Sequence, residues 1–96
     1  MSLDIYVIGR GDVQDAHFGD DAEESFLRMC QAAPDDTLRR GVVKHGRTMF
    51  NPVQLRRFVA ELEALPAAER TPVVREVEAA AHLAIRSSGC LLIVGE

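Results

Sequence analysis

The side chains best suited to chemistry lie near the middle of the sequence, where His45, Arg47, Thr48 and Asn51 follow one another closely. An imidazole, a guanidinium and a hydroxyl beside the start of a helix could hold a carboxylate or a phosphate, because the free N–H groups of a helix N-terminus attract anions. A capping Asn51 would occupy the same N–H groups. A small ligand-binding domain or enzyme with an anion pocket at His45, Arg47 and this helix start is therefore our alternative function.

These residues belong to a longer basic segment, residues 37–60. It contains no Asp or Glu and holds six of the eleven Lys and Arg residues, although the net charge of the chain is −4. Such segregation favours electrostatically steered binding of an acidic partner, whereas internal pairing with the acidic N-terminal third is the competing interpretation. The partner- or anion-binding residues that we predict are Arg39, Arg40, Lys44, His45, Arg47, Arg56 and Arg57.

Other residue patterns that carry chemistry are missing from the sequence, so we predict no catalytic residue, no metal site and no cofactor. The hydroxyl residues lack a Gly-x-Ser-x-Gly elbow, and no Gly-rich phosphate loop opens a helix. No two of His17, His45 and His82 have a zinc-ligand spacing. His82 instead lies between Glu78 and Arg86 at four-residue intervals, which is typical of side-chain pairing on a helix surface.

The composition sets limits on the class of protein. Ninety-six residues with 47% hydrophobic and 27% charged residues predict one globular domain, residues 1–96. The two cysteines are too few for a disulfide framework, and we expect both to be reduced. The apolar runs are far shorter than the roughly 20 residues that cross a bilayer, and no basic region precedes the first of them. We therefore expect a cytoplasmic protein without membrane contact.

The elements that position these residues can be read from capping and periodicity. Three helices are expected, near residues 22–33, 52–65 and 72–88, each with apolar residues at three- and four-residue spacing. The middle helix has the clearest start, since Asn51 can cap it, Pro52 suits its first turn and Gln54 completes a capping box.

Strands are expected near residues 3–8, 42–44, 47–50 and 90–94, with a hairpin turn at His45-Gly46 and a loop over residues 9–19. The run at 90–94 is continuously apolar, which is typical of a strand covered on both faces. The elements together predict an α+β fold with a small mixed sheet packed by three helices.

One stretch, Gly46-Arg47-Thr48-Met49-Phe50-Asn51-Pro52-Val53-Gln54, followed by Glu61-Leu62 and a final strand ending in Gly95-Glu96, resembles a group of small uncharacterised bacterial proteins. These share a Gly-x-Thr-x-Phe-Asn-x-x-Gln helix start and a C-terminal strand that ends in Gly-Asp or Gly-Glu. Arg47 takes a position that is usually acidic in that group. The resemblance covers about half of the chain, implies the fold and brings no known activity.

The function that these observations favour is that of a small interaction protein, of the immunity or antitoxin-like kind, which binds a protein partner through the basic segment. A second copy of the chain is one such partner, because the acidic N-terminal third of one subunit could meet the basic segment of the other. We do not expect nucleic acid as a partner, since the chain is acidic and has only five aromatic residues. Whether the protein is an enzyme stays open, and no is the preferred answer.

Overall fold

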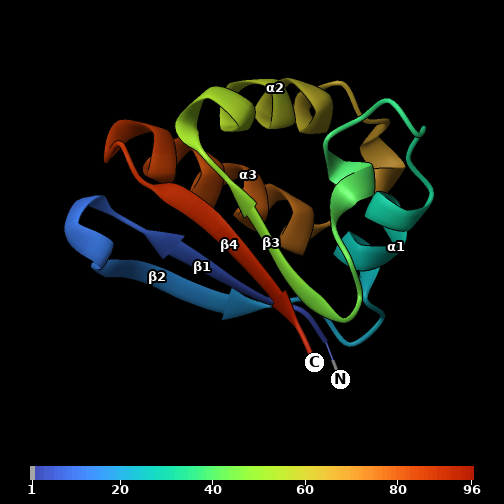
Figure 1. Ribbon diagram of the computed structural model, residues 1–96. Coiled ribbons are helices and arrows are strands. Elements are labelled where there is room, and N and C mark those ends of the chain that lie inside the picture. Colours follow the sequence, from blue (N-terminus) through green and yellow to red (C-terminus); the bar gives the residue numbers. More distant parts are fainter. Residues whose placement is uncertain (1) are drawn as a thin grey trace.

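The sheet is built around two apolar strands from opposite ends of the chain. The computed structural model, which describes residues 2–96, pairs β1 (Asp4–Ile8) with β4 (Cys90–Gly95). β2 (Gln14–Gly19) flanks β1 and β3 (Gly46–Phe50) flanks β4, so the strand order is β2-β1-β4-β3 (Figure 1). All three strand pairs are antiparallel. The predicted α+β class is confirmed, while the sheet is antiparallel and not mixed.

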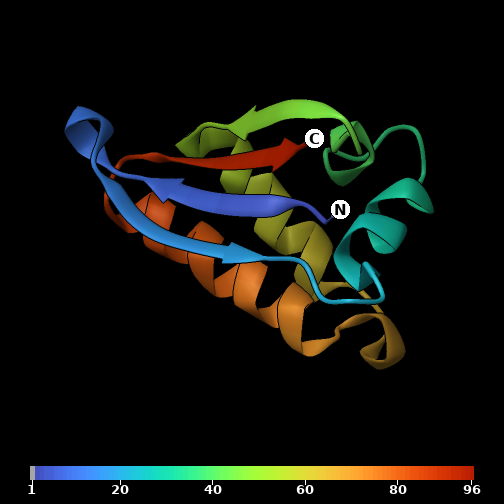
Figure 2. The same ribbon diagram turned by 90° about the horizontal axis from the view of Figure 1, so that it is seen from below.

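Helices cover one face of this sheet. The described chain contains α1 (Ser25–Gln31), α2 (Pro52–Glu63) and α3 (Pro72–Arg86). Figures 1 and 2 show α2 and α3 on the same side of the sheet, with α1 beside the end where β1 begins and β4 stops. The described chain also contains three short 3-10 turns: η1 (Arg10–Asp12), η2 (Arg39–Gly41) and η3 (Ala67–Glu69). No helix within residues 2–96 has the length and apolarity needed to span a bilayer.

The core lies between the sheet and the helices. Every second residue of the two central strands points inward and is fully buried, while α2 and α3 contribute the apolar residues of one helical face. Phe50 at the end of β3 stacks on Phe58 of α2 with ring centroids 4.9 Å apart. The largest fully buried side chains are Phe26, Phe58, Leu3, Ile5, Leu55, Leu62, Leu91 and Ile93. Burial of this set is the main force that holds the two layers together.

The three predicted helices are present, with ends that differ by a few residues. α1 begins at Ser25 instead of residue 22 because Glu24 has a left-handed backbone (φ +56°), which a helix cannot include. The Asp20 carboxylate accepts hydrogen bonds from the N–H groups of Phe26 and Leu27, and Asp21 accepts from Ser25. α2 ends at residue 63 and α3 at residue 86. The capping box that the sequence predicts at Asn51 and Gln54 forms.

Two strand predictions are wrong. Residues 42–44 form no strand, because Val42 follows η2 and buries its side chain in the core as part of a loop, with 4% of its surface exposed. Residues 14–19, expected as loop, form β2 and pair with β1. The turn between β1 and β2 contains Gly11 (φ +80°) and Asp12 (φ +62°), and this left-handed pair reverses the chain at η1.

Candidate interaction surface

The face of the sheet that no helix covers is largely apolar. Because side chains alternate along a strand, the residues between the buried ones of β1 and β4 point away from the helices. In β1 these are Asp4, Tyr6 and Ile8, and in β4 they include Val94 and Leu92, although Leu92 is only 8% exposed. Met49 of β3 is opposite Leu92 and has 56% of its surface exposed. We call these residues, together with Arg47 and Gln14, the open sheet face.

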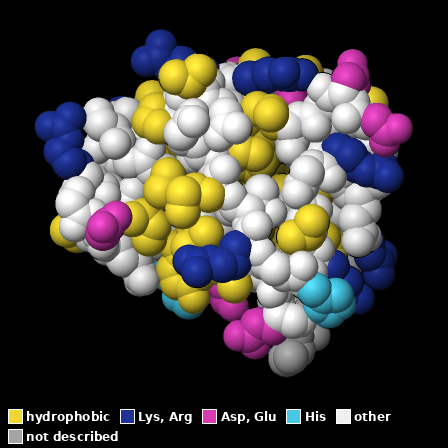
Figure 3. All heavy atoms as spheres, in the orientation of Figure 1, with side chains coloured by type: hydrophobic (Ala, Val, Ile, Leu, Met, Phe, Trp, Pro, Cys, Tyr) yellow, Lys and Arg dark blue, Asp and Glu magenta, His cyan; other side chains and the backbone are white. Residues whose placement is uncertain are grey.

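The open sheet face has a shallow hollow at its centre. The hollow has a volume of about 350 Å³ and is lined by Tyr6, Ile8, Gln14, Arg47, Leu92 and Val94. In Figure 3, hydrophobic side chains gather over the sheet on the side turned to the viewer, with a basic side chain among them. Such a patch on a small protein is typical of a surface that binds another molecule.

The charges on this face are separated across the strands. Arg47 of β3 lies opposite Val94 of β4, and Val94 lies opposite Asp4 of β1, so a base and an acid flank one apolar residue in the same row. Among residues 2–96, Arg47 has no carboxylate within ion-pair distance. Asp4 Oδ1 lies 3.2 Å from His17 Nε2 of β2, and the His17 ring stacks on Tyr6 with centroids 4.4 Å apart. The face therefore carries a base on its edge strand β3 and an acid on the inner strand β1.

Three of the seven predicted residues, Arg39, Arg40 and Arg57, are paired with other groups of the same molecule. Arg39 forms a largely buried ion pair with Glu61 of α2, with its Nη1 3.1 Å from Oε1. Arg57 Nε lies 3.7 Å from the other Glu61 oxygen, and its Nη2 donates to the Asp36 carbonyl. Arg40 donates to the carbonyls of Gln31 and Ala33 at the end of α1, and its Nη2 lies 3.8 Å from Asp35 Oδ1. These arginines hold the segment before β3 against α1 and α2.

The remaining members of the predicted set belong to three different places in the fold. Arg47 is on the open sheet face, and His45 at the adjacent edge places its Nδ1 2.6 Å from the Glu96 carbonyl oxygen. Lys44 precedes His45 and is exposed, while Arg56 is exposed on α2, in the helical layer. The seven predicted residues are therefore spread over β3, the segment before it and α2.

The groups that would build the alternative anion pocket do not converge. Arg47 points to the open sheet face, and its neighbour Thr48 points the other way, with its Oγ1 3.5 Å from the Gly41 carbonyl oxygen. At the start of α2, Asn51 Oδ1 accepts from the Gln54 N–H at 2.9 Å. The helix N-terminus is thus already capped.

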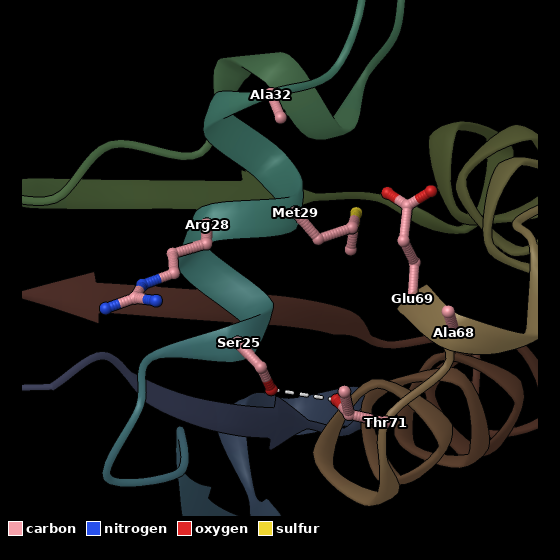
Figure 4. A pocket seen from close by; sticks show the side chains of 7 residues that line it. All are labelled: Ser25, Arg28, Met29, Ala32, Ala68, Glu69 and Thr71. Carbon is pink, nitrogen blue, oxygen red and sulfur yellow. Dashed lines mark hydrogen bonds between the residues drawn. The ribbon is translucent and has the colours of Figure 1, made fainter.

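A second hollow lies where α1 meets η3 and the start of α3. It has a volume of about 240 Å³, and Figure 4 shows Ser25 of α1 and Thr71 at the start of α3 directed toward each other, with their hydroxyl oxygens 2.8 Å apart. Ser25 Oγ also donates to the Asp21 carboxylate, which lowers the pKa of Asp21. The Ser25 hydroxyl bridges the Asp21 carboxylate and the Thr71 hydroxyl, so this arrangement links α1 to the start of α3.

Ligand-type side chains meet at one further place, between α2 and α3. One ligand atom from each of Glu63, Glu78 and His82 lies within 4.8 Å of the others. The sequence predicts that His82 pairs with Glu78 and Arg86 along the helix. In the structure Glu78 forms its ion pair with Arg70, whose Nη2 lies 2.6 Å from Glu78 Oε1. The four-residue spacing of Glu78 and His82 is a signal in the sequence, but nothing there shows that Glu63 joins them.

Sequence reasoning also missed the aromatic and aliphatic members of the open sheet face. The only sign of them in the sequence is the continuous apolarity of β4, which predicts that both faces of the strand are covered but does not identify the covering element.

Comparison with family models, with curated proteins and with solved structures returned no match for this sequence.

Proposed function

We propose that this chain is an interaction protein that binds a protein partner through the open sheet face, and that this partner is a second copy of the chain. The observation that carries the proposal is the mismatch between the sheet and its cover. β4 is apolar on both faces, yet the helices cover only one of them. Antiparallel sheets that face water normally have a polar outer side, so apolar residues there favour contact with another protein.

The layout of the face suits a copy of itself. A twofold axis parallel to the strands and midway between two stacked sheets would place β1 over β4 of the second copy, and β2 over β3. Strands lie about 4.8 Å apart and stacked sheets about 10 Å apart, so the long Arg47 side chain of one copy would come within reach of Asp4 of the other. Symmetry gives this pair twice, and the apolar side chains of the next row along the strands, Tyr6, Leu92 and Met49, would pack beside both pairs.

The size of the face sets the strength of the expected pairing. Four strands at about 4.8 Å and five residues at about 3.4 Å give a footprint of about 19 by 17 Å. With side-chain relief, each copy would bury about 500–600 Å² of accessible surface, which is at the low end for specific interfaces. We therefore expect a reversible dimer with a dissociation constant on the order of 10 µM, not an obligate one.

Sedimentation velocity over a micromolar concentration series tests this proposal. The wild-type chain should shift from monomer to dimer as its concentration rises. Met49→Lys should remove the dimer, because it places a charge in the apolar row at an exposed position that tolerates the change. The matched control is Val53→Lys on α2, which is 79% exposed in the helical layer and should dimerise as the wild type does.

Charge variants distinguish this geometry from a nonspecific apolar contact. Arg47→Asp and Asp4→Arg should each weaken the dimer, and the double variant that exchanges the two charges should recover most of the lost affinity. A chain that stays monomeric throughout the concentration series overturns the proposal. So does a dimer that Met49→Lys leaves intact, or a monomer that binds an unrelated protein as an immunity protein would.

A further inference from the structure

The second inference concerns the cluster of ligand-type side chains between α2 and α3. Glu63 is the last residue of α2, while Glu78 and His82 lie one turn apart on α3. One ligand atom from each lies within 4.8 Å of the others, with Glu78 and His82 partly buried and Glu63 exposed. We propose that these three residues bind a divalent transition-metal ion of the Zn²⁺ class.

The distances are close to those of an occupied site. Ligand atoms at about 2.0–2.1 Å from a tetrahedral zinc ion lie about 3.4 Å from one another. The three atoms of the cluster therefore need to close by roughly 1.5 Å at most, starting from their limit of 4.8 Å. Rotation of the exposed Glu63 side chain can supply most of this movement, since one flexible side chain at a helix end is free to turn.

The donor set selects the class of ion. Calcium and magnesium prefer sites made entirely of oxygen atoms, whereas an imidazole nitrogen with two carboxylates suits zinc and its neighbours in the first transition row. The two carboxylates bring a charge of −2 to one point between the helices, and Arg70 offsets one of these charges through its ion pair with Glu78. A dication would balance the remaining charge and relieve the repulsion between the carboxylates.

Arg70 completes the surroundings of the cluster. Its Nη2 donates to Glu78 Oε1 at 2.6 Å, so one oxygen of that carboxylate is held while the other remains available to an ion. An outer partner that orients a ligand in this way is a regular feature of metal sites. The ion pair accounts for the position of Glu78 but gives no reason for Glu63 and His82 to meet it. The ion would link the end of α2 to α3 and leave a coordination position open to solvent.

Zinc titration of the chain, stripped of metal with EDTA, tests the inference by calorimetry. We expect one ion per chain and a thermal midpoint that rises with zinc concentration, because the ion binds the folded state. Glu63→Gln, at an exposed position, should weaken binding by roughly tenfold or more, which is at least the effect of losing an outer-shell partner. His82→Ala should weaken it at least as much. Magnesium should not compete.

Variants of the other two histidines and the spectrum of the cobalt form provide the controls. His17→Ala and His45→Ala remove imidazoles outside the cluster and should leave the zinc affinity unchanged. Cobalt in place of zinc should give visible absorption without an intense near-ultraviolet thiolate band, because no cysteine belongs to the site. Absence of zinc binding overturns the inference. Binding that survives both Glu63→Gln and His82→Ala, or that depends on His17, His45 or a thiolate, overturns it as well.

Discussion

Removal of Glu61 should destabilise the protein more than any other single change of a charged residue. Its Oε2 accepts from the Leu38 N–H at 2.8 Å, and its Oε1 accepts from the N–H of Arg39 at 3.2 Å and from the Arg39 guanidinium at 3.1 Å. The side chains of Glu61 and Arg39 are only 11% and 13% exposed. Glu61 thus fixes the loop before β3 to α2 and neutralises the most buried arginine of the basic segment.

The magnitude follows from what Glu61→Ala leaves behind. The Arg39 guanidinium would stay largely buried without a counter-ion, and loss of one partner of a buried pair costs about 3–5 kcal/mol. Some water would reach the site, so we expect a loss of about 3 kcal/mol in the free energy of unfolding. For a chain of this size, 1 kcal/mol moves the thermal midpoint by about 4–8 °C, which predicts a fall of about 12–24 °C.

Urea and thermal unfolding followed by circular dichroism measure this change. Glu76→Ala, an exposed residue of α3, is the control and should stay within about 0.5 kcal/mol of the wild type. Replacement of both partners, as Arg39→Met with Glu61→Leu, should recover part of the stability, because no charge remains buried although the N–H groups of Leu38 and Arg39 still lose their acceptor. A loss below about 1 kcal/mol for Glu61→Ala would refute the reasoning, since Arg39 would then be solvated and the basic segment available to partners.

Two further predictions concern the start of α2 and the cysteines. Asn51→Ala should lower the free energy of unfolding by about 1 kcal/mol, since it removes the acceptor of the Gln54 N–H. Urea unfolding measures this change, and Asn51→Asp, which keeps an acceptor, should stay close to the wild type. Equal losses of stability in the two variants would contradict the capping role. Burial raises the pKa of both thiols, far more for Cys30 than for the partly exposed Cys90. Alkylation followed by mass spectrometry should therefore modify Cys90 first as the pH rises, and equal rates would show that Cys30 is not buried in solution.

The helices could be predicted from the sequence because their signals are local. Asn51, Pro52 and Gln54 specify the start of α2 within four residues, and the structure contains that capping box. The start of α1 was placed too early because the Asp20 and Asp21 carboxylates reach N–H groups four to seven residues ahead, and the left-handed Glu24 between them leaves no mark in the sequence.

The sheet was harder to predict because its pairings are not local. The inward Ala16 and Phe18 of β2 are a weak alternating signal until β1 lies beside them. Val42 has a strand-forming side chain, yet it fills the core from a loop. Local propensity favours a strand at Val42 and gives little sign of one at β2. In both places the tertiary contacts lead to the opposite outcome.

The candidate site shows the same division between local and distant information. The sequence identifies Arg47 as a residue of interest and β4 as apolar on both faces. It cannot show that Arg39 is neutralised by Glu61, which lies 22 residues away. Nor can it show that the open sheet face has an acid and a base in one row, because that depends on the register of β1, β4 and β3.

The two proposals can be separated because they depend on different layers of the molecule. Met49 lies on the sheet, and Glu63 lies at the end of α2 in the helical layer. Met49→Lys should therefore abolish the dimer and leave zinc affinity unchanged, whereas Glu63→Gln should weaken zinc binding and leave the dimer intact. If zinc strengthened the dimer of the wild type, the gain would have to pass through the packing of α3 against β1 and β4. Because such coupling is reciprocal, Met49→Lys would then weaken zinc binding at protein concentrations where the wild type is dimeric. Zinc titrations of the wild type and of Met49→Lys at such a concentration therefore decide between independent and coupled sites.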